Sequence, residues 1–246
     1  MLQHMYAAVI EHGCGLAAWR PNSALGHATS SSPEGPFTLK RLIKPHFAHE
    51  PVALMGTDGT IMIWHIGAGE NTTGPGSNYA ANCSHCTGSD HKWTGGGSFY
   101  GPTSVIYSRS FDGPWESMDA GYGSKVPGCP KCGDTNPAPL LRPDGSVVMM
   151  WRTTLMEPQP TACPAASCMG LASAPSWKGP YNWSRANIFA NQADATHTHI
   201  EDAHMWLAPK DSANPGSYHA IFHSDVSKTP SSSSSSFSSF ACCCCC

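Results

Sequence analysis

The chain has 246 residues, a formal net charge of −3, and only 13% charged residues against 40% hydrophobic ones. A chain of this length can bury a sizeable core, but its charge offers no basic surface for nucleic acid or an anionic membrane. No apolar run approaches the ~18 residues that a membrane-spanning helix needs, so we expect neither a nucleic-acid partner nor a membrane span.

The start of the chain, MLQHMYAAVIEHGCG, does not resemble a signal peptide, because it lacks a basic start and because Glu11 and His12 interrupt its apolar stretch. Cysteine usage nonetheless indicates an oxidising compartment, since seven cysteines lie in the body of the chain. We therefore expect a protein of the extracellular space or the secretory pathway, although no signal peptide is present in this chain.

The elements predicted along the chain recur. Residues 1–48 supply the later strands of a first unit, closed by HATSSSPEGPF. A complete unit follows at 49–115, where HEPVALMGTDGTIMIWHIG forms two apolar strands around an Asp-Gly turn and SVIYSRSFDGPW closes the unit with Gly-Pro-aromatic. Asp-Gly between two apolar runs is a strong hairpin signal, because the turn requires residues that tolerate positive φ.

The same order of motifs returns further along the chain. Residues 135–181 hold a second complete unit, from TNPAPLLRPDGSVVMMWR to GLASAPSWKGPY, and IEDAHMWLAPKDSANPGSYHAIFHS opens a partial unit at 200–225. Residues 226–246 then become runs of serine and cysteine, which we expect to be disordered. Trp64, Trp151 and Trp206 recur on predicted strands, where repeated aromatic residues usually belong to the core.

Two different motifs recurring in the same order, with roughly four short strands per unit, predict an all-β protein of the β-propeller type. The units would make about three to four blades of one propeller domain over residues 1–225. A β-sandwich whose turns are similar by coincidence is the alternative.

The blade-opening motifs FAHEPVALMGTDGTIMIWHIG, TNPAPLLRPDGSVVMMWR and EDAHMW resemble those of the family 43 glycoside hydrolases, within the arabinanase, levansucrase and invertase superfamily. The resemblance covers roughly residues 4–225. It implies a five-bladed β-propeller, incomplete at both ends here, whose opening strands line a central funnel. It also implies an oligo- or polysaccharide of plant or algal type as the partner, with no cofactor required for the reaction.

In that family a first-blade Asp activates water, a second-blade Asp tunes the pKa of the acid, and a third-blade Glu protonates the leaving group, which inverts the anomeric carbon. Such a site needs two carboxyl groups about 6.5–9.5 Å apart. Here the strand for the first-blade Asp would precede Met1, the second-blade position holds Glu50, and the third holds Asn136. Either the roles have moved by one blade, or the blade count is off by one, or catalysis has been lost.

The strongest candidates for catalysis are Glu201 as general acid and Asp202 turned towards a neighbouring blade, with Glu50 as a further carboxylate. Strand alternation places His204 on the same side as Asp202. For these acids the alternative is a solvated loop before a strand. A second group of polar residues would bind the sugar or pair with a carboxylate: Asn136, His49, His204, Arg152 and Asp134.

The cysteines allow three interpretations: a zinc site, disulfides or free thiols. CSHC and CPKC form two C-x-x-C motifs, whose four thiols can hold a structural Zn²⁺ or form disulfides that tie two long loops together. The residues concerned are Cys83, Cys86, Cys129 and Cys132. The family resemblance also implies a central His that coordinates water or Ca²⁺, for which His223 and His204 are the candidates.

The sequence therefore predicts a glycosidase of the arabinofuranosidase, xylosidase or galactosidase kind that acts by single displacement, or a relative that has lost this activity. Two alternatives stay open. One is a non-catalytic propeller that binds glycans through its funnel, and the other is a zinc-stabilised interaction module built on the two C-x-x-C pairs.

Overall fold

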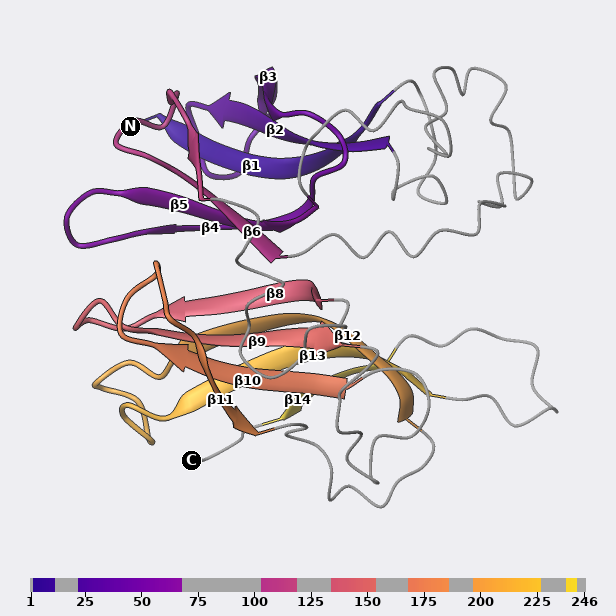
Figure 1. Ribbon diagram of the computed structural model, residues 1–246, viewed down its shortest axis with the longest axis vertical. Helices are drawn as coiled ribbons and strands as arrows, with labels where there is room; N and C mark the ends of the chain where they lie inside the picture. Colours follow the sequence, from indigo (N-terminus) through magenta and orange to yellow (C-terminus); the bar gives the residue numbers. More distant parts are fainter. Residues whose placement is uncertain are drawn as a thin grey trace, which may run out of the picture. The chain divides into compact units, whose positions relative to one another are not determined.

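All regular elements in the described part of the chain are β-strands, and every strand pairing is antiparallel (Figure 1). The described part of the chain contains no helix long and apolar enough to cross a membrane. The chain divides into two compact units, Met1–Tyr122 and Gly123–Cys246, each with two sheets. The computed structural model describes residues 2–11, 22–67, 103–118, 134–153, 168–185, 197–226 and 238–242.

The first unit contains a three-stranded sheet of order β1-β2-β3 and a four-stranded sheet of order β4-β5-β6-β7. The strand β4 packs beside β1 and β2, so the two sheets share one core. The strands are β1 (Gln3–Ile10), β2 (Ser23–Ser30), β3 (Thr38–Lys44), β4 (His49–Met55), β5 (Ile61–Ile66), β6 (Thr103–Ser108) and β7 (Glu116–Ser117).

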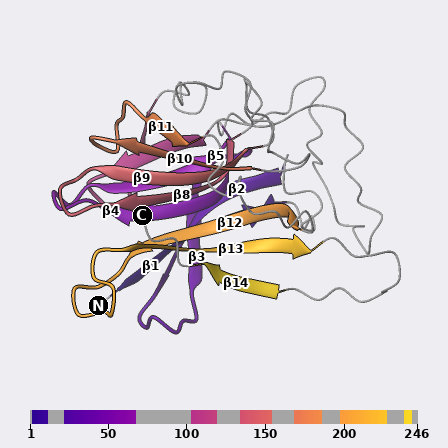
Figure 2. The ribbon, with the colours of Figure 1, turned by 90° about the horizontal axis from the view of Figure 1, so that it is seen from below.

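The second unit contains a four-stranded sheet of order β11-β10-β9-β8 and a three-stranded sheet of order β12-β13-β14. Here β12 packs against β8 and β9 (Figure 2). The strands are β8 (Asp134–Leu141), β9 (Val147–Thr153), β10 (Cys168–Ala174), β11 (Asn182–Arg185), β12 (His197–Leu207), β13 (Tyr218–Val226) and β14 (Ser238–Cys242).

The two Asp-Gly hairpins are confirmed, and they share one structure. Asp58 and Asp144 each accept a hydrogen bond from the backbone N–H of the residue two positions later, at 2.9 Å in both turns. The glycines that follow, Gly59 and Gly145, have φ of 79° and 83°. The wider turn between β12 and β13 also contains a positive-φ glycine, Gly216 at 76°. These backbone angles explain why the turns require Gly.

The three Gly-Pro-aromatic motifs also share one structure. Gly35, Gly113 and Gly179 have φ of 84°, 83° and 82°, and each precedes a cis proline. The N–H of each glycine donates to the carbonyl of a serine three residues earlier, at 3.1, 3.0 and 2.9 Å. Each motif joins the last two strands of its sheet: β2 to β3, β6 to β7 and β10 to β11.

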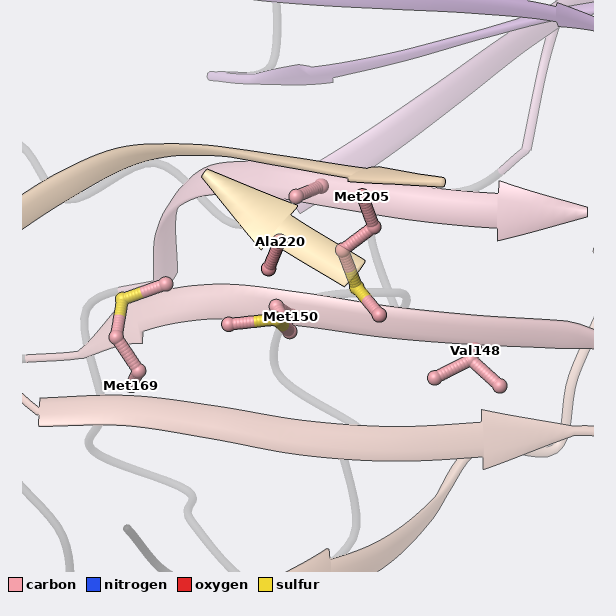
Figure 3. Close-up of a cluster of buried hydrophobic side chains, with 6 residues drawn as sticks. Val148, Met150, Met169, Met205 and Ala220 are labelled. Atoms are coloured by element: carbon pink, nitrogen blue, oxygen red, sulfur yellow. The ribbon is translucent and has the colours of Figure 1, made fainter. Parts of the chain in front are cut away.

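Each unit has its own apolar core. Trp64 on β5 and Trp151 on β9 are completely buried, which confirms them as core residues, whereas Trp206 on β12 is 38% exposed. In the first unit the core cluster consists of Leu25, Ala48, Ile63 and Ile106, with Tyr6, Ile43 and Trp115 packed against it. In the second unit it is rich in methionine and consists of Ala138, Val148, Met150, Met169, Met205 and Ala220 (Figure 3).

Part of the C-terminal segment expected to be disordered forms a strand. Residues 238–242 pair with β13 as β14. The physical reason is that the outer edge of β13 presents backbone N–H and C=O groups, and any extended segment can satisfy them. Val226 ends β13, and the remainder of 226–246 lies outside the described residues.

Candidate functional site

One backbone feature marks the opening strands β4, β8 and β12. Glu50, Asn136 and Asp202 have φ of 53°, 53° and 55°, in the left-handed region that few residues other than glycine adopt. In each strand the pairing with the next strand shifts register at this point, which indicates a β-bulge. Bulges re-aim side chains and are frequent beside active sites. The three residues are therefore equivalent positions of the repeat, and Asp202 rather than Glu201 is the counterpart of Glu50.

In the second unit this geometry brings two of the predicted site residues together. The Nδ2 of Asn136, on β8, donates a hydrogen bond to Oδ1 of Asp202, on β12, at 2.7 Å. Asn136 is only 5% exposed, whereas Asp202 is exposed. A buried amide therefore holds one carboxylate oxygen, and the hydrogen bond is charge-assisted when Asp202 is ionised. The Asp202 carboxyl group is presented to solvent in a fixed orientation.

The positive φ of Asp202 also changes which residues share its side of the strand. Met205, on β12, packs into the core against β8 and β9, and Asp202 reaches Asn136 on β8. His204 instead lies on the opposite face, where its ring stacks on Trp206 with centroids 6.3 Å apart. Simple alternation placed His204 beside Asp202, and the bulge between Glu201 and His204 is the reason that it does not lie there.

In the first unit the equivalent acid is Glu50, whose side chain is 25% exposed. His49 Nε2 lies 3.9 Å from Glu50 Oε1. Burial lowers the pKa of His49 to about 4, so the imidazole is neutral near pH 7 and the pair is not an ion pair there. The ring of His49 also stacks on Phe47, with centroids 6.5 Å apart. Glu50 is thus partly buried beside a neutral imidazole.

Sequence reasoning missed a second acid at the same end of the first unit. Glu11 follows β1, and its Oε2 lies 3.0 Å from Nδ1 of His46, just before β4. The His46 side chain is 7% exposed and that of Glu11 is 21% exposed. No sequence signal joined these two residues, because 35 positions separate them and neither belongs to a repeated motif. Nearby, burial lowers the pKa of His65 to about 4.

Of the remaining predicted site residues, the structure describes Arg152. Arg152 is half-buried at the end of β9, and its backbone pairs with Thr135. The side chains of Glu201, Asp134 and His223 lie outside the described residues, as do all four cysteines of the C-x-x-C pairs: Cys83, Cys86, Cys129 and Cys132. Their roles stay predictions. Within the described ranges, no three His, Cys, Asp or Glu side chains are grouped to hold a metal ion.

The sequence matches no protein-family model and no curated protein sequence. Solved structures do match the fold. The endo-arabinase of Bacteroides thetaiotaomicron superposes with a TM-score of 0.53 at 13% identity, covering 97% of this chain and 69% of the arabinase. A mutant of the family 43 protein BlXynB from Bacillus licheniformis gives 0.52 at 13% identity, covering 92% of this chain and 35% of that protein.

A family 117 glycoside hydrolase from the marine bacterium Zobellia galactanivorans gives a TM-score of 0.51 at 16% identity, covering 90% of this chain and 62% of that enzyme. The chain has the fold of the β-propeller glycoside hydrolases. The expected all-β propeller class is therefore confirmed. The chain spans about a third of BlXynB and about two thirds of the other two proteins, so the likeness carries the propeller fold and no activity.

The left-handed backbone of the propeller's opening strands predicts an unusual ranking of variants at Glu50. We expect Glu50→Gly to be more stable than Glu50→Ala by about 1 kcal/mol, because alanine retains the Cβ that clashes at positive φ. At an ordinary strand position the ranking is reversed, so Ala53→Gly on the same strand should destabilise by about 0.5–1 kcal/mol. Urea unfolding of the three variants measures both differences. A Glu50→Gly protein less stable than Glu50→Ala would show that the bulge does not constrain this residue.

Proposed function

We propose that this chain hydrolyses glycosidic bonds of plant- or algal-type polysaccharides, as a glycoside hydrolase-like protein. The observation that supports the proposal most is the contact between Asn136 and Asp202, which orients an exposed carboxylate at a bulged, left-handed position of an opening strand. Strained backbone of this kind concentrates at functional sites. The same position carries a second acid, Glu50, in the first unit.

The reaction proposed is a single displacement. One carboxylate accepts a proton from water as the water oxygen bonds to the anomeric carbon, and a carboxylic acid gives its proton to the leaving oxygen as the glycosidic bond breaks. Asp202, exposed and held by an amide donor, suits the carboxylate that accepts the proton. Glu201, the acid next to Asp202 in the chain, is the candidate for the proton donor, and its substitution tests this role.

A non-catalytic glycan-binding protein is the second candidate, and one observation favours it. Asn136 stands where the two equivalent positions carry acids, and an amide cannot transfer a proton. An Asn–Asp pair on two strands that pack together can instead donate hydrogen bonds to sugar hydroxyls and accept hydrogen bonds from them. Binding without turnover would then be the whole function of the site.

The test is a substrate screen with the purified full chain. Aryl arabinofuranosides, xylosides and galactosides, together with arabinan, xylan and galactan, are assayed for released phenol or reducing sugar. Binding to the same polysaccharides is measured by calorimetry, with the exposed surface variant Lys210→Ala as the control. We expect hydrolysis of at least one substrate, unchanged by Lys210→Ala. Saturable binding without release would favour the second candidate, and neither binding nor release would overturn both.

A further inference from the structure

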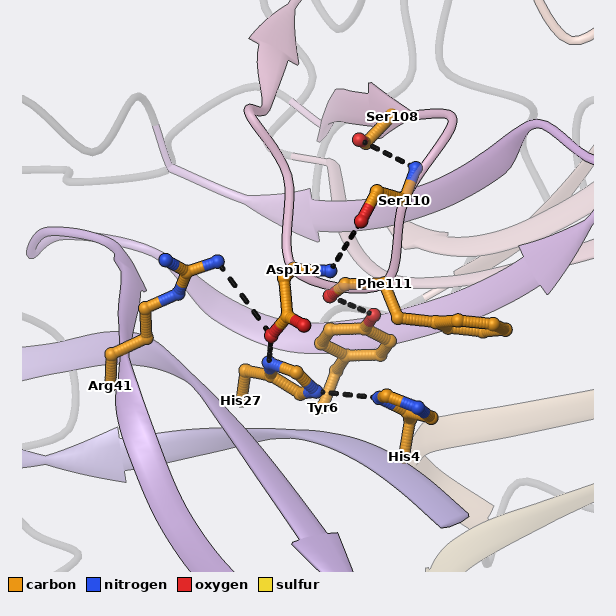
Figure 4. A network of polar contacts seen from close by, with 8 residues as sticks. All are labelled: His4, Tyr6, His27, Arg41, Ser108, Ser110, Phe111 and Asp112. Atoms are coloured by element: carbon orange, nitrogen blue, oxygen red, sulfur yellow. Dashed lines mark hydrogen bonds and ion pairs between the residues drawn. The ribbon is translucent and has the colours of Figure 1, made fainter. Parts of the chain in front are cut away.

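A cluster of polar and aromatic side chains joins the two sheets of the first unit (Figure 4). His4 and Tyr6 lie on β1, and His27 lies on β2 directly opposite Tyr6. The turn between β6 and β7, residues 109–115, contributes Phe111 and Asp112. The turn therefore contacts the first sheet through these five side chains.

Two imidazole rings stand at the centre of the contact. Nδ1 of His4 lies 2.9 Å from Nε2 of His27, and Nδ1 of His27 lies 3.5 Å from Oδ1 of Asp112. His27 is completely buried, although the Asp112 side chain is 70% exposed. The ring of His4 also stacks on Phe111, with centroids 4.2 Å apart, and the Tyr6 hydroxyl donates to the Phe111 carbonyl at 2.8 Å.

The charge of Asp112 favours one tautomer of His27. Its carboxylate lies 3.5 Å from Nδ1 of His27, without a hydrogen bond, and favours a proton on that nitrogen. In this tautomer Nε2 of His27 accepts a hydrogen bond from Nδ1–H of His4. A further proton can then bind only at Nε2 of His4. If both rings were fully protonated, two N–H groups would face each other at 2.9 Å, and the contact would break. While the β6–β7 turn stays docked on the first sheet, the pair of histidines therefore accepts one extra proton and excludes a second.

The surroundings oppose the second proton as well. Arg41 Nη2, on β3, lies 3.9 Å from Oδ1 of Asp112, and Lys40 of the same strand adds to the positive field at His27. Burial lowers the pKa of His27, and the Asp112 carboxylate only partly opposes this effect. Burial likewise raises the pKa of Tyr6, which stays neutral and supplies no compensating charge. Among the described residues, Asp112 is the one anion whose charge raises the pKa of His27.

We propose that His4 and His27 form an acid-sensitive latch, which holds the β6–β7 turn on the first sheet near neutral pH and releases it when the pair binds a second proton. The sign follows from linkage. A released pair binds two protons below the ordinary histidine pKa of about 6.5, and the docked pair binds one. The free-energy preference for the docked turn is therefore fully present above that pH and decreases as the pH falls below it. Each extra proton lowers the ratio of docked to released protein about tenfold per pH unit.

Hydrogen exchange of the full chain tests the latch. Peptides from residues 108–118 are compared at about pH 7.5 and about pH 5, which bracket the ordinary histidine pKa, after correction for the intrinsic exchange rate. Burial lowers the pKa of His49 and His65, so acid also destabilises the whole sheet through these two residues. Exchange in residues 52–62, the β4–β5 hairpin, measures this global effect and serves as the reference. We expect exchange in the turn to rise at least tenfold at the lower pH, relative to the hairpin.

The matched variant is His4→Gln, whose side-chain amide donates to Nε2 of His27 when that ring is neutral and, turned over, accepts from Nε2–H when the ring is protonated. The docked and released states of this variant therefore bind the same number of protons. In it the turn should exchange no faster than the hairpin at either pH. If the exchange rates of turn and hairpin changed equally with pH in the unsubstituted protein, the latch would be overturned. It would also be overturned if exchange in the turn of the variant rose with acid as much as it does in the unsubstituted protein. If His4→Gln does not fold, NMR titration of the ring nitrogens in the unsubstituted protein decides. Two protons bound by the pair while the turn stays protected would overturn the proposal.

Discussion

Replacing Asp202 by asparagine is expected to lower kcat for glycoside hydrolysis by about 10²- to 10⁴-fold, the usual contribution of a positioned general acid or base. The substitution keeps the size of the side chain, and asparagine tolerates the φ of 55° that this position requires. The Asn136 side chain retains a polar partner, so the fold should survive. Circular dichroism and steady-state kinetics on the substrate found in the screen measure the two effects separately.

Glu201→Gln is the comparison variant, because it removes the neighbouring acid with the same change of chemistry. A loss of activity confined to Asp202→Asn would show that Asp202, the residue equivalent to Glu50, transfers the proton. Equal losses in both variants would assign the two acids to the two proton transfers. Full activity of Asp202→Asn together with an inactive Glu201→Gln would contradict the account and return the main role to Glu201.

Replacing Trp151 by alanine is expected to destabilise the protein by about 3–5 kcal/mol, the usual cost of removing a fully buried large aromatic side chain. Trp151 is 0% exposed on the second strand of its sheet, where Trp64 holds the same place in the first unit. A domain is normally stable by only about 5–15 kcal/mol, so the variant should lose a large share of its stability. Urea unfolding followed by circular dichroism measures this difference.

Trp206→Ala is the matched control, because this tryptophan is 38% exposed and lies outside the core cluster of the second unit. Its removal should cost under about 1 kcal/mol, as for most substitutions at partly exposed positions. If Trp206→Ala destabilised the protein as much as Trp151→Ala, the core of the second unit would have to include that outer face of β12.

Local chemistry explains which parts of the fold could be predicted from the sequence. Asp58-Gly59 and Asp144-Gly145 specify their hairpins within a few residues, because the turn needs positive φ and a side chain that caps it. The Gly-Pro-aromatic closings are equally local. Burial of Trp64 and Trp151 followed from their recurrence on apolar strands.

The candidate site depends on interactions that the sequence does not show. Asn136 and Asp202 are 66 positions apart, and their contact forms only because β12 packs on β8. The bulges at these residues override strand alternation, which is why His204 lies on the other face of β12. The His4–His27 contact likewise depends on the register of β1 against β2. Packing between strands, rather than local propensity, determines all three.

The most direct test of the central claim, that the Asn136–Asp202 pair belongs to a glycan site, is a crystal structure of the Asp202→Asn variant with an oligosaccharide from the hydrolysed polymer. We predict a sugar ring within hydrogen-bonding distance of the side chains at positions 136 and 202, with its glycosidic oxygen beside the bulge of β12. A sugar bound elsewhere, with both side chains unaltered and in contact only with water, would contradict it.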